Sequence, residues 1–430
     1  MYDATARLAA IRAAIPAEGL FAGKDWRLTP RPFLIDPQLH DELTKLGYRL
    51  LLFQKACNEL YFRSVSGKAP AWIADLLDRG KPSELVALGR RKATRAELPA
   101  VIRPDLVLTD GDSPGRHSFA IAELDTVPGG IGLIGWLNQL YDGFGTHDVI
   151  GRGSGMIDGF HSIVPEGRVL ISREAETYKP EMHWMAGQSD GALVVEDAEA
   201  LSKPQPHYRF YELFDLPNLP TAALLASSPV TPPLKAFLEE KLWFALFWSR
   251  PLREFWRREL SERHFLELQK VIPFTWILDP TPLPHHAVIP GLEINDWREL
   301  AAFSQKHRDL VIKISGFSEI GWGARSVKIG SDLPHQEWQT AIEHALTDFP
   351  HHPWILQRFH KAGIVEHPFF ASDSGSIETM KGRVRLSPYY FVINGKAELR
   401  GALATIVPAD KKILHGMKDA VLAPTAVSAA

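Results

Sequence analysis

The sequence predicts an α+β protein, because helical and strand-like patterns occupy different parts of the chain. Apolar residues recur at intervals of three and four across 39–63 and again across 70–79. This spacing places the apolar side chains on one face of a helix. From Val101 onward, short alternating or β-branched runs are separated by turn-forming residues, which indicates strands.

The first strands are expected to form a hairpin. Runs at 105–109 and 118–123 read as strands, and the intervening 110–115 is rich in aspartate, glycine and proline. The acidic residues of this region then lie at the ends of the strands. A helical pattern resumes at 130–141.

A small parallel sheet is expected next. A strand at 168–172, a helix at 180–187 and a strand at 191–196 have the spacing of a β-α-β unit, the start of a doubly wound sheet. The proline-rich 215–233 is expected to be a connection, and 234–268 is expected to be helical.

The last third of the chain predicts an α+β lobe with one helix at 336–346. Strands are expected at 310–314, 325–329, 354–359, 383–393 and 398–406. The segment 423–430 is small and uncharged, so a frayed end is expected there.

Composition narrows the classes of partner. The 430 residues suggest roughly three domains. Lys and Arg (48) nearly balance Asp and Glu (51), so the net charge of −3 creates no field that would recruit nucleic acid or an anionic membrane.

The one cysteine, Cys57, lies in a helical pattern and is expected to be a buried thiol. No secretory signal and no apolar run of ~18 residues is visible, which predicts a cytoplasmic protein.

An acidic motif near the front of the chain is a candidate metal site. It comprises Arg103 and Asp105, followed by Glu123 and Asp125. Alternation along a strand places Glu123 and Asp125 on one face, and a paired strand can bring Asp105 beside them. Three clustered carboxylates repel unless a cation such as Mg²⁺ neutralises them. Solvated loop acids are the alternative interpretation.

A lysine with a glycine-rich loop near the back is a candidate phosphate site. Lys313 ends an apolar strand, where an ammonium needs an anionic partner. Gly316, Gly321 and Gly323 would let backbone N–H groups approach a phosphate closely. An ordinary hairpin turn with a paired lysine is the alternative, and the motif is not a P-loop.

Two further segments carry candidate residues. Gln357 and Phe359 end an apolar strand, as in an adenine-binding segment, although such strands are often plain core. Arg385 is a guanidinium on an otherwise apolar strand. It would either stabilise charge on a transferred phosphoryl group or pair with a buried acid.

The order of these motifs resembles the circularly permuted ATP-grasp family, in which the acids precede the phosphate-binding lysines, and is similar to the synthetase domain of the glutathionylspermidine synthase type. The resemblance implies that Asp105, Glu123 and Asp125 hold Mg²⁺ and that Arg103 lies near the phosphoryl-transfer centre. It further implies that Lys270 and Lys313 contact the nucleotide. The position of Asp125 is usually asparagine in the family.

The resemblance also implies an organisation of the chain into a helical N-terminal region, a Mg²⁺-binding part of the core, a pre-ATP-grasp-like α/β unit, a helical connector and a nucleotide-binding lobe. The corresponding segments are 1–100, 101–165, 166–233, 234–300 and 301–430.

The implied activity is an ATP-dependent ligase that joins a small-molecule or peptide carboxylate to an amine, or to a thiol, through an acyl phosphate. Arg103 and Arg385 would stabilise the charge that develops during transfer. Two alternatives stay open: a non-catalytic ATP-binding regulator or assembly subunit, and a metal-dependent phosphotransferase.

Overall fold

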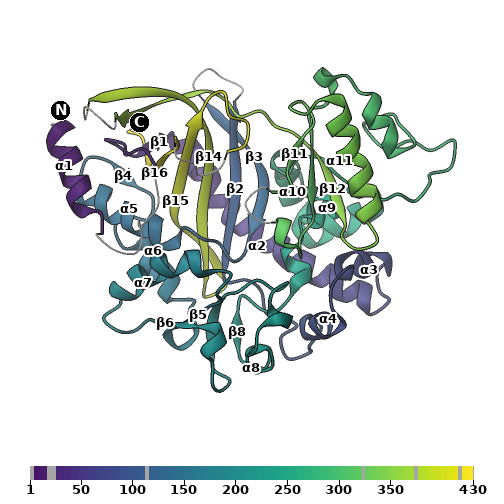
Figure 1. The fold of residues 1–430 in the computed structure, drawn as a ribbon, viewed down its shortest axis with the longest axis horizontal. Coiled ribbons are helices and arrows are strands. Elements are labelled where there is room, and N and C mark those ends of the chain that lie inside the picture. Colours follow the sequence, from purple (N-terminus) through teal and green to yellow (C-terminus); the bar gives the residue numbers. More distant parts are fainter. Residues whose placement is uncertain are drawn as a thin grey trace. The chain divides into compact units, whose positions relative to one another are not determined.

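The computed structural model describes residues 4–16, 26–111, 116–321, 325–371, 376–414 and 419–429 (Figure 1). The chain divides into two compact units. Unit 1 comprises Met1–Leu52, Ala96–Leu234 and Lys361–Ala430, and unit 2 comprises Phe53–Arg95 and Lys235–His360. Each unit is therefore assembled from segments that are distant in the sequence.

Unit 1 is built on an eight-stranded sheet. Its main path is β1 (Phe33–Ile35), β16 (Val421–Val427), β15 (Lys396–Pro408), β14 (Ile377–Ile393), β2 (Val101–Asp110) and β3 (His117–Asp125), while β13 (Val365–Phe370) joins β14 and β4 (Asp148–Val149) joins β16. The β1–β16 pair is parallel, and the β2–β3 pair is antiparallel. The predicted hairpin is therefore confirmed, with longer strands than expected.

The expectation of a frayed C-terminus was wrong. Residues 421–427 form β16, which pairs with β15, β4 and β1. Ala423 and Ala426 are fully buried. A run of small uncharged residues predicts a frayed end, but here these residues fit a strand that is buried inside the sheet.

Helices α5 (Ile131–Gly143) and α6 (Gly155–His161) pack against this sheet. The helix predicted at 130–141 is thereby confirmed. Gly130 precedes α5 with φ 87°, a conformation that favours glycine. Helix α1 (Ala4–Ala14) and the first part of α2 (Pro37–Val65) also belong to unit 1.

A second sheet of unit 1 is parallel and has the order β6 (Val194–Asp197), β5 (Arg168–Ile171), β7 (His207–Phe210) and β8 (Val230–Thr231). Together with α7 (Lys179–Gly187), it confirms the predicted β-α-β unit. The proline-rich segment expected as a connection instead contains α8 (Ala222–Ser227) and β8, because its prolines lie beside these elements and not inside their hydrogen-bonded parts.

Unit 2 contains an antiparallel sheet of the order β11 (Lys328–Ile329), β10 (Leu310–Ile314), β12 (Trp354–Arg358) and β9 (Thr275–Ile277). Trp338 and Ile342 of α11 (His335–Asp348) belong to the apolar cluster on one face of this sheet. The strand predicted at 310–314 and the helix predicted at 336–346 are confirmed, and the strand predicted at 325–329 is shortened to two residues.

The remaining helices of unit 2 are α3 (Trp72–Asp78), α4 (Ser83–Gly89), α9 (Leu242–Trp248), α10 (Arg253–Val271) and the second part of α2. They confirm the helical patterns at 39–63 and 70–79. The stretch expected to be helical at 234–268 contains two α-helices, α9 and α10, which are separated by the 3₁₀ segment Arg250–Leu252. Short 3₁₀ segments lie at Pro165–Gly167, Glu176–Tyr178, Ala198–Ala200, Leu216–Asn218, Ala236–Glu239, Arg250–Leu252, Trp297–Ala302, Gln305–His307 and Glu319–Gly321.

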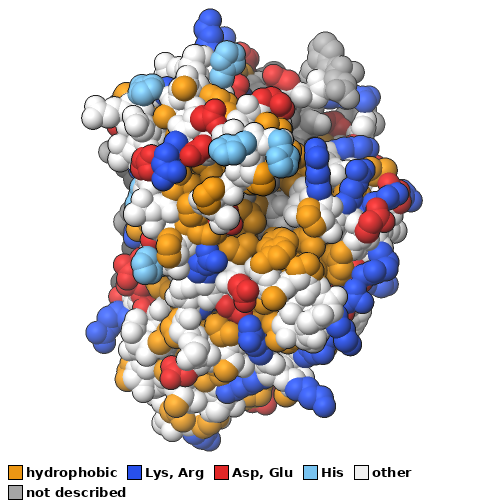
Figure 2. Space-filling view, turned by 90° about the vertical axis from the view of Figure 1, so that its right-hand side faces the viewer, with side chains coloured by type: hydrophobic (Ala, Val, Ile, Leu, Met, Phe, Trp, Pro, Cys, Tyr) orange, Lys and Arg blue, Asp and Glu red, His pale blue; other side chains and the backbone are white. Residues whose placement is uncertain are grey.

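Within the described part of the chain, no helix has the length and apolar character needed to cross a bilayer. Figure 2 shows Lys and Arg side chains interspersed with Asp and Glu on the face that it draws, in keeping with the nearly balanced composition. Cys57 is buried, and burial raises the pKa of its thiol.

Candidate functional site

The predicted acidic motif lies on one face of the β2–β3 hairpin. Arg103 is paired with Asp125, and Asp105 is paired with Glu123. Directly opposed residues of an antiparallel pair project to the same face, as do residues two apart on one strand. All four side chains therefore share a face, as the alternation predicted.

Arg103 connects the two aspartates of this motif. Its Nε lies 3.2 Å from Asp105 Oδ1 and its Nη2 lies 3.0 Å from Asp125 Oδ2. Its Nη1 also donates a 3.2 Å hydrogen bond to the Gly129 carbonyl. Burial lowers the pKa of Arg103, but the two carboxylates outweigh burial and the pKa is raised. The guanidinium is therefore held firmly in its charged form.

The neighbouring strand β14 supplies a second arginine and a serine to Asp105. Arg385 Nη1 lies 3.2 Å from Asp105 Oδ2, and Ser387 Oγ donates a 2.9 Å hydrogen bond to Asp105 Oδ1. The register that pairs Arg385 with Val107 brings Ser387 opposite Asp105. Arg385 thus does pair with a buried acid, and that acid belongs to the predicted site.

Sequence reasoning missed Ser387 and Tyr389. The Tyr389 hydroxyl donates a 2.7 Å hydrogen bond to the Gly129 carbonyl, which also accepts from Arg103. The available signal was the alternation of Arg385, Ser387 and Tyr389, three polar side chains on one face of an apolar strand. Tyr389 fixes the backbone that leads into α5.

The acids suit Mg²⁺ by chemical type, because hard divalent cations prefer carboxylate oxygens. Burial and the nearby charges of Glu123 and Asp105 raise the pKa of Asp125, against the opposing effects of Arg103 and the Val127 amide. A bound cation would relieve this excess of negative charge.

The arrangement nevertheless commits the carboxylate oxygens of Asp105 to other partners. Both oxygens of Asp105 contact an arginine, and among the described residues there is no group of three or more His, Cys, Asp or Glu side chains arranged to hold a metal. A cation held by Asp105 would have to share its oxygens with Arg103 and Arg385. The Mg²⁺ assignment of Asp105, Glu123 and Asp125 stays a prediction.

Lys313 lies in unit 2 on the sheet face opposite α11. Its neighbours Ile312 and Ile314 belong to the apolar cluster that includes Trp338 of α11, so Lys313 projects to the other side. Its Nζ donates a 3.1 Å hydrogen bond to Gln357 Oε1. Two residues that were predicted separately to contact a nucleotide are thus in contact with each other.

The loop that follows Lys313 is fixed at its first residues. A Cβ atom on Gly316 would lie 3.0 Å from the Glu239 carbonyl oxygen and 3.0 Å from Glu240 Cδ, so this position favours glycine. At Gly321 a Cβ atom would come no closer than 3.7 Å, which is an ordinary contact. Gly323 lies outside the described residues. Phe317 has φ 42°, a strained conformation for a bulky residue.

A buried ion pair holds this loop in place. Lys81 Nζ lies 2.5 Å from Glu240 Oε1, and each side chain is only 2% exposed. The other carboxylate oxygen of Glu240 accepts a hydrogen bond from Ser315 Oγ, which in turn accepts from the Leu242 amide at 2.9 Å. Sequence reasoning missed this network, whose members come from three distant segments.

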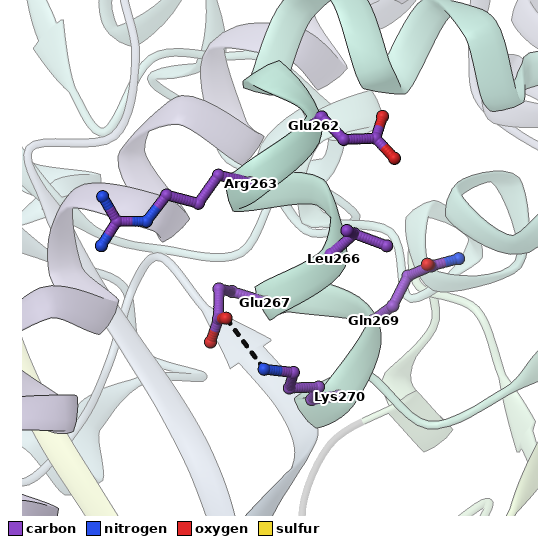
Figure 3. Close-up of a pocket in the computed structure, with 6 residues that line it drawn as sticks. All are labelled: Glu262, Arg263, Leu266, Glu267, Gln269 and Lys270. Atoms are coloured by element: carbon purple, nitrogen blue, oxygen red, sulfur yellow. Dashed lines mark hydrogen bonds and ion pairs between the residues drawn. The ribbon is translucent and has the colours of Figure 1, made fainter.

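The remaining candidates of unit 2 are more exposed. Lys270 lies in the last turn of α10, its side chain is 67% exposed, and its Nζ is 2.8 Å from Glu267 (Figure 3). It borders a shallow depression of about 740 Å³ lined by residues of α10 alone. Phe359 is half-buried just beyond β12, where its N–H donates to the Asp309 carbonyl at 3.0 Å.

The candidate residues therefore form two groups. The arginines and acids belong to unit 1, whereas Lys270, Lys313, the glycine loop, Gln357 and Phe359 belong to unit 2. The expected nucleotide-binding lobe, 301–430, contributes to both units, because 361–430 supplies strands to the eight-stranded sheet.

Comparison with known proteins supports a fold and no more. No protein family model matches the chain. No curated protein matches it either. Among solved structures, the chain is similar to a glutathione synthetase-like effector, GSS30, from Globodera pallida in its apo form, with a TM-score of 0.54 and 11% identity over 100% of this chain and 98% of that chain. The fold is thus mixed α+β and consistent with an ATP-grasp-like fold, and the circular permutation stays a prediction.

Proposed function

We propose that the chain is an ATP-dependent ligase that joins a carboxylate to an amine, or to a thiol, through an acyl phosphate. The observation that carries the proposal is the pair of arginines on Asp105: Arg103 and Arg385 lie 3.2 Å from its two oxygens, on the face that also bears Glu123. The likeness in fold to a glutathione synthetase-like protein adds support.

The residues of unit 2 would bind the nucleotide. Lys313 would contact the phosphates, with Gly316 and Gly321 giving backbone N–H groups close access to them. Lys270 would provide a second cation, for which its exposed side chain must leave Glu267. Gln357 and Phe359 remain candidates to contact the adenine base of the nucleotide.

The residues of unit 1 would serve the chemistry. The substrate carboxylate attacks the γ-phosphorus, the bond to the β-phosphate oxygen breaks and ADP leaves; the amine then attacks the acyl carbon and phosphate departs. Arg103 and Arg385 stabilise the negative charge of these steps. Ser387 keeps Asp105 oriented toward both arginines. Mg²⁺, when bound by the acids, supplies further charge neutralisation.

Product analysis tests this proposal. The protein would be incubated with Mg²⁺, ATP, hydroxylamine and a panel of carboxylic acids, and the products followed by ³¹P NMR and hydroxamate colour. The expected result is one ADP, one phosphate and one hydroxamate per turnover. AMP and pyrophosphate would refute the acyl-phosphate route.

Arg385 variants tie the activity to the site. Arg385→Ala should slow turnover ~10³-fold if its guanidinium meets the transferred group, by analogy with arginine fingers. Arg385→Lys keeps the charge and should lose less. An Arg385→Ala protein as fast as the wild type would limit this residue to pairing with Asp105.

A non-catalytic ATP-binding protein is the second candidate. It is favoured by the structural neighbour, which is itself described as an effector. Calorimetry would show that such a protein binds ATP, and the protein would release neither ADP nor hydroxamate with any acid.

A metal-dependent phosphotransferase would consume ATP without forming a hydroxamate.

A further inference from the structure

A chain of hydrogen bonds crosses three strands of the unit 2 sheet and ends on Lys313. Thr275 Oγ1 on β9 donates to the Pro273 carbonyl at 2.8 Å. Gln357 Nε2 on β12 donates to Thr275 Oγ1 at 3.1 Å, and Lys313 Nζ on β10 donates to Gln357 Oε1 at 3.1 Å. Thr275, Gln357 and Lys313 are all buried.

The direction of this chain is fixed by chemistry. A carbonyl oxygen only accepts, so the single hydroxyl proton of Thr275 is used on Pro273, and its oxygen can only accept from Gln357. The amino group of the Gln357 amide must then face Thr275, which turns its carbonyl oxygen toward Lys313. The reversed amide would place N–H groups against an ammonium, which has no lone pair to offer.

We propose that Thr275 and Gln357 are positioning residues that hold the Lys313 ammonium in place for the phosphates of ATP. The proposal rests on the proposed nucleotide-binding role of Lys313. A lysine carries its charge on a flexible four-carbon stem, so an oriented acceptor removes much of the freedom that binding would otherwise have to restrict. Thr275 acts on the ammonium only through Gln357.

A matched pair of substitutions at Thr275 tests the proposal in the full chain. Thr275→Val keeps the shape but removes the hydroxyl, whereas Thr275→Ser keeps the hydroxyl. Affinity for Mg-ATP and for inorganic triphosphate would be measured by calorimetry. Thr275→Val should weaken both about three- to tenfold, the loss of one hydrogen bond, and Thr275→Ser should bind like the wild type.

The measurement with inorganic triphosphate assigns any loss of affinity to the phosphate end of the nucleotide, since this probe has no adenine base. Wild-type affinity in Thr275→Val, or equal losses in Thr275→Val and Thr275→Ser, would overturn the proposal. If Thr275→Val fails to fold, Gln357→Met provides the same measurement, because it removes the amide while keeping a side chain of similar length.

A second readout does not depend on nucleotide binding. Brief labelling with an amine-acylating reagent, followed by mass spectrometry of the Lys313 peptide, reports how firmly the ammonium is held. Lys313 should react faster in Thr275→Val than in the wild type or Thr275→Ser, and equal rates would overturn the positioning role. A wild-type protein that binds neither probe would refute the proposed function while this labelling still tests the positioning.

Discussion

Replacing Lys81 by methionine tests the buried ion pair that holds the end of β10. Methionine keeps most of the side-chain length but carries no charge, so Glu240 would lose its cation at a position that is 2% exposed. Removing one partner of a buried ion pair costs about 3–5 kcal/mol, because the other charge is left uncompensated. Lys81→Met should therefore be among the most damaging single substitutions in unit 2.

The size of the effect can be measured as a melting temperature. The melting temperature of a unit of this size falls by about 2–4 °C for each kcal/mol of stability lost. In scanning calorimetry the melting temperature of unit 2 should therefore fall by ~6–20 °C. Hydrogen exchange in peptides covering 310–321 should accelerate, since Glu240 also accepts from Ser315 at the start of this loop.

An exposed ion pair of the same unit serves as the control. Lys270 Nζ lies 2.8 Å from Glu267, but its side chain is 67% exposed. Lys270→Met should cost at most about 0.5 kcal/mol, because water screens such pairs. The control separates the effect of burial from that of losing a lysine.

A double-mutant cycle completes the test. Glu240→Gln removes the opposite charge, and the double variant should lose less than the sum of the two single losses, by up to about 3 kcal/mol, because no unpaired charge remains. A Lys81→Met protein within about 0.5 kcal/mol of the wild type would refute the reasoning, as would strict additivity.

Two further predictions concern pH. Burial raises the pKa of Asp125 and outweighs the opposing effect of Arg103, so the wild type loses stability as the pH rises through that raised pKa. Asp125→Asn does not titrate there, so the stability of this variant relative to the wild type in urea unfolding should rise from pH 3 to pH 7, and a constant difference would contradict the cause. Burial, helped by Arg209, lowers the pKa of His207 from 6.5 to about 4. The neutral imidazole therefore makes its full contribution to the stability of the fold above pH 6.5, and this contribution is lost as the pH falls toward 4. That loss amounts to about 3 kcal/mol at pH 4 and below, and a His207→Gln protein should lack it.

Local patterns predicted many of the secondary-structure elements. The strand expected at 310–314 matches β10 residue for residue, and the helix expected at 130–141 differs from α5 by a few terminal residues. These elements carry their own signal, because the apolar period follows directly from which face is buried.

Elements defined by distant partners were harder to predict. Strand β16 is a run of small residues whose backbone pairs with β15, β1 and β4. Its burial depends on neighbours elsewhere in the chain and leaves little trace in its own side chains. The two-residue strand β8 is likewise defined by its pairing with β7.

The candidate site shows the same division. The shared face of Arg103, Asp105, Glu123 and Asp125 was predictable, because it depends on alternation along two adjacent strands. The contact of Asp105 with Arg385 joins residues 280 positions apart, and that of Lys81 with Glu240 joins residues 159 apart. A sequence indicates that a buried charge needs a partner, whereas the topology decides which one it receives.

The partner that the topology gives Lys313 bears on what this lysine can do. A lysine ending an apolar strand needs an acceptor. A carboxylate introduced at position 357 would neutralise the ammonium and compete with an incoming phosphate. Gln357 accepts from Lys313 through a neutral amide oxygen, so this contact orients the ammonium without cancelling its charge. Gln357→Glu should accordingly weaken triphosphate binding by calorimetry, and unchanged affinity would contradict a phosphate-binding role for Lys313.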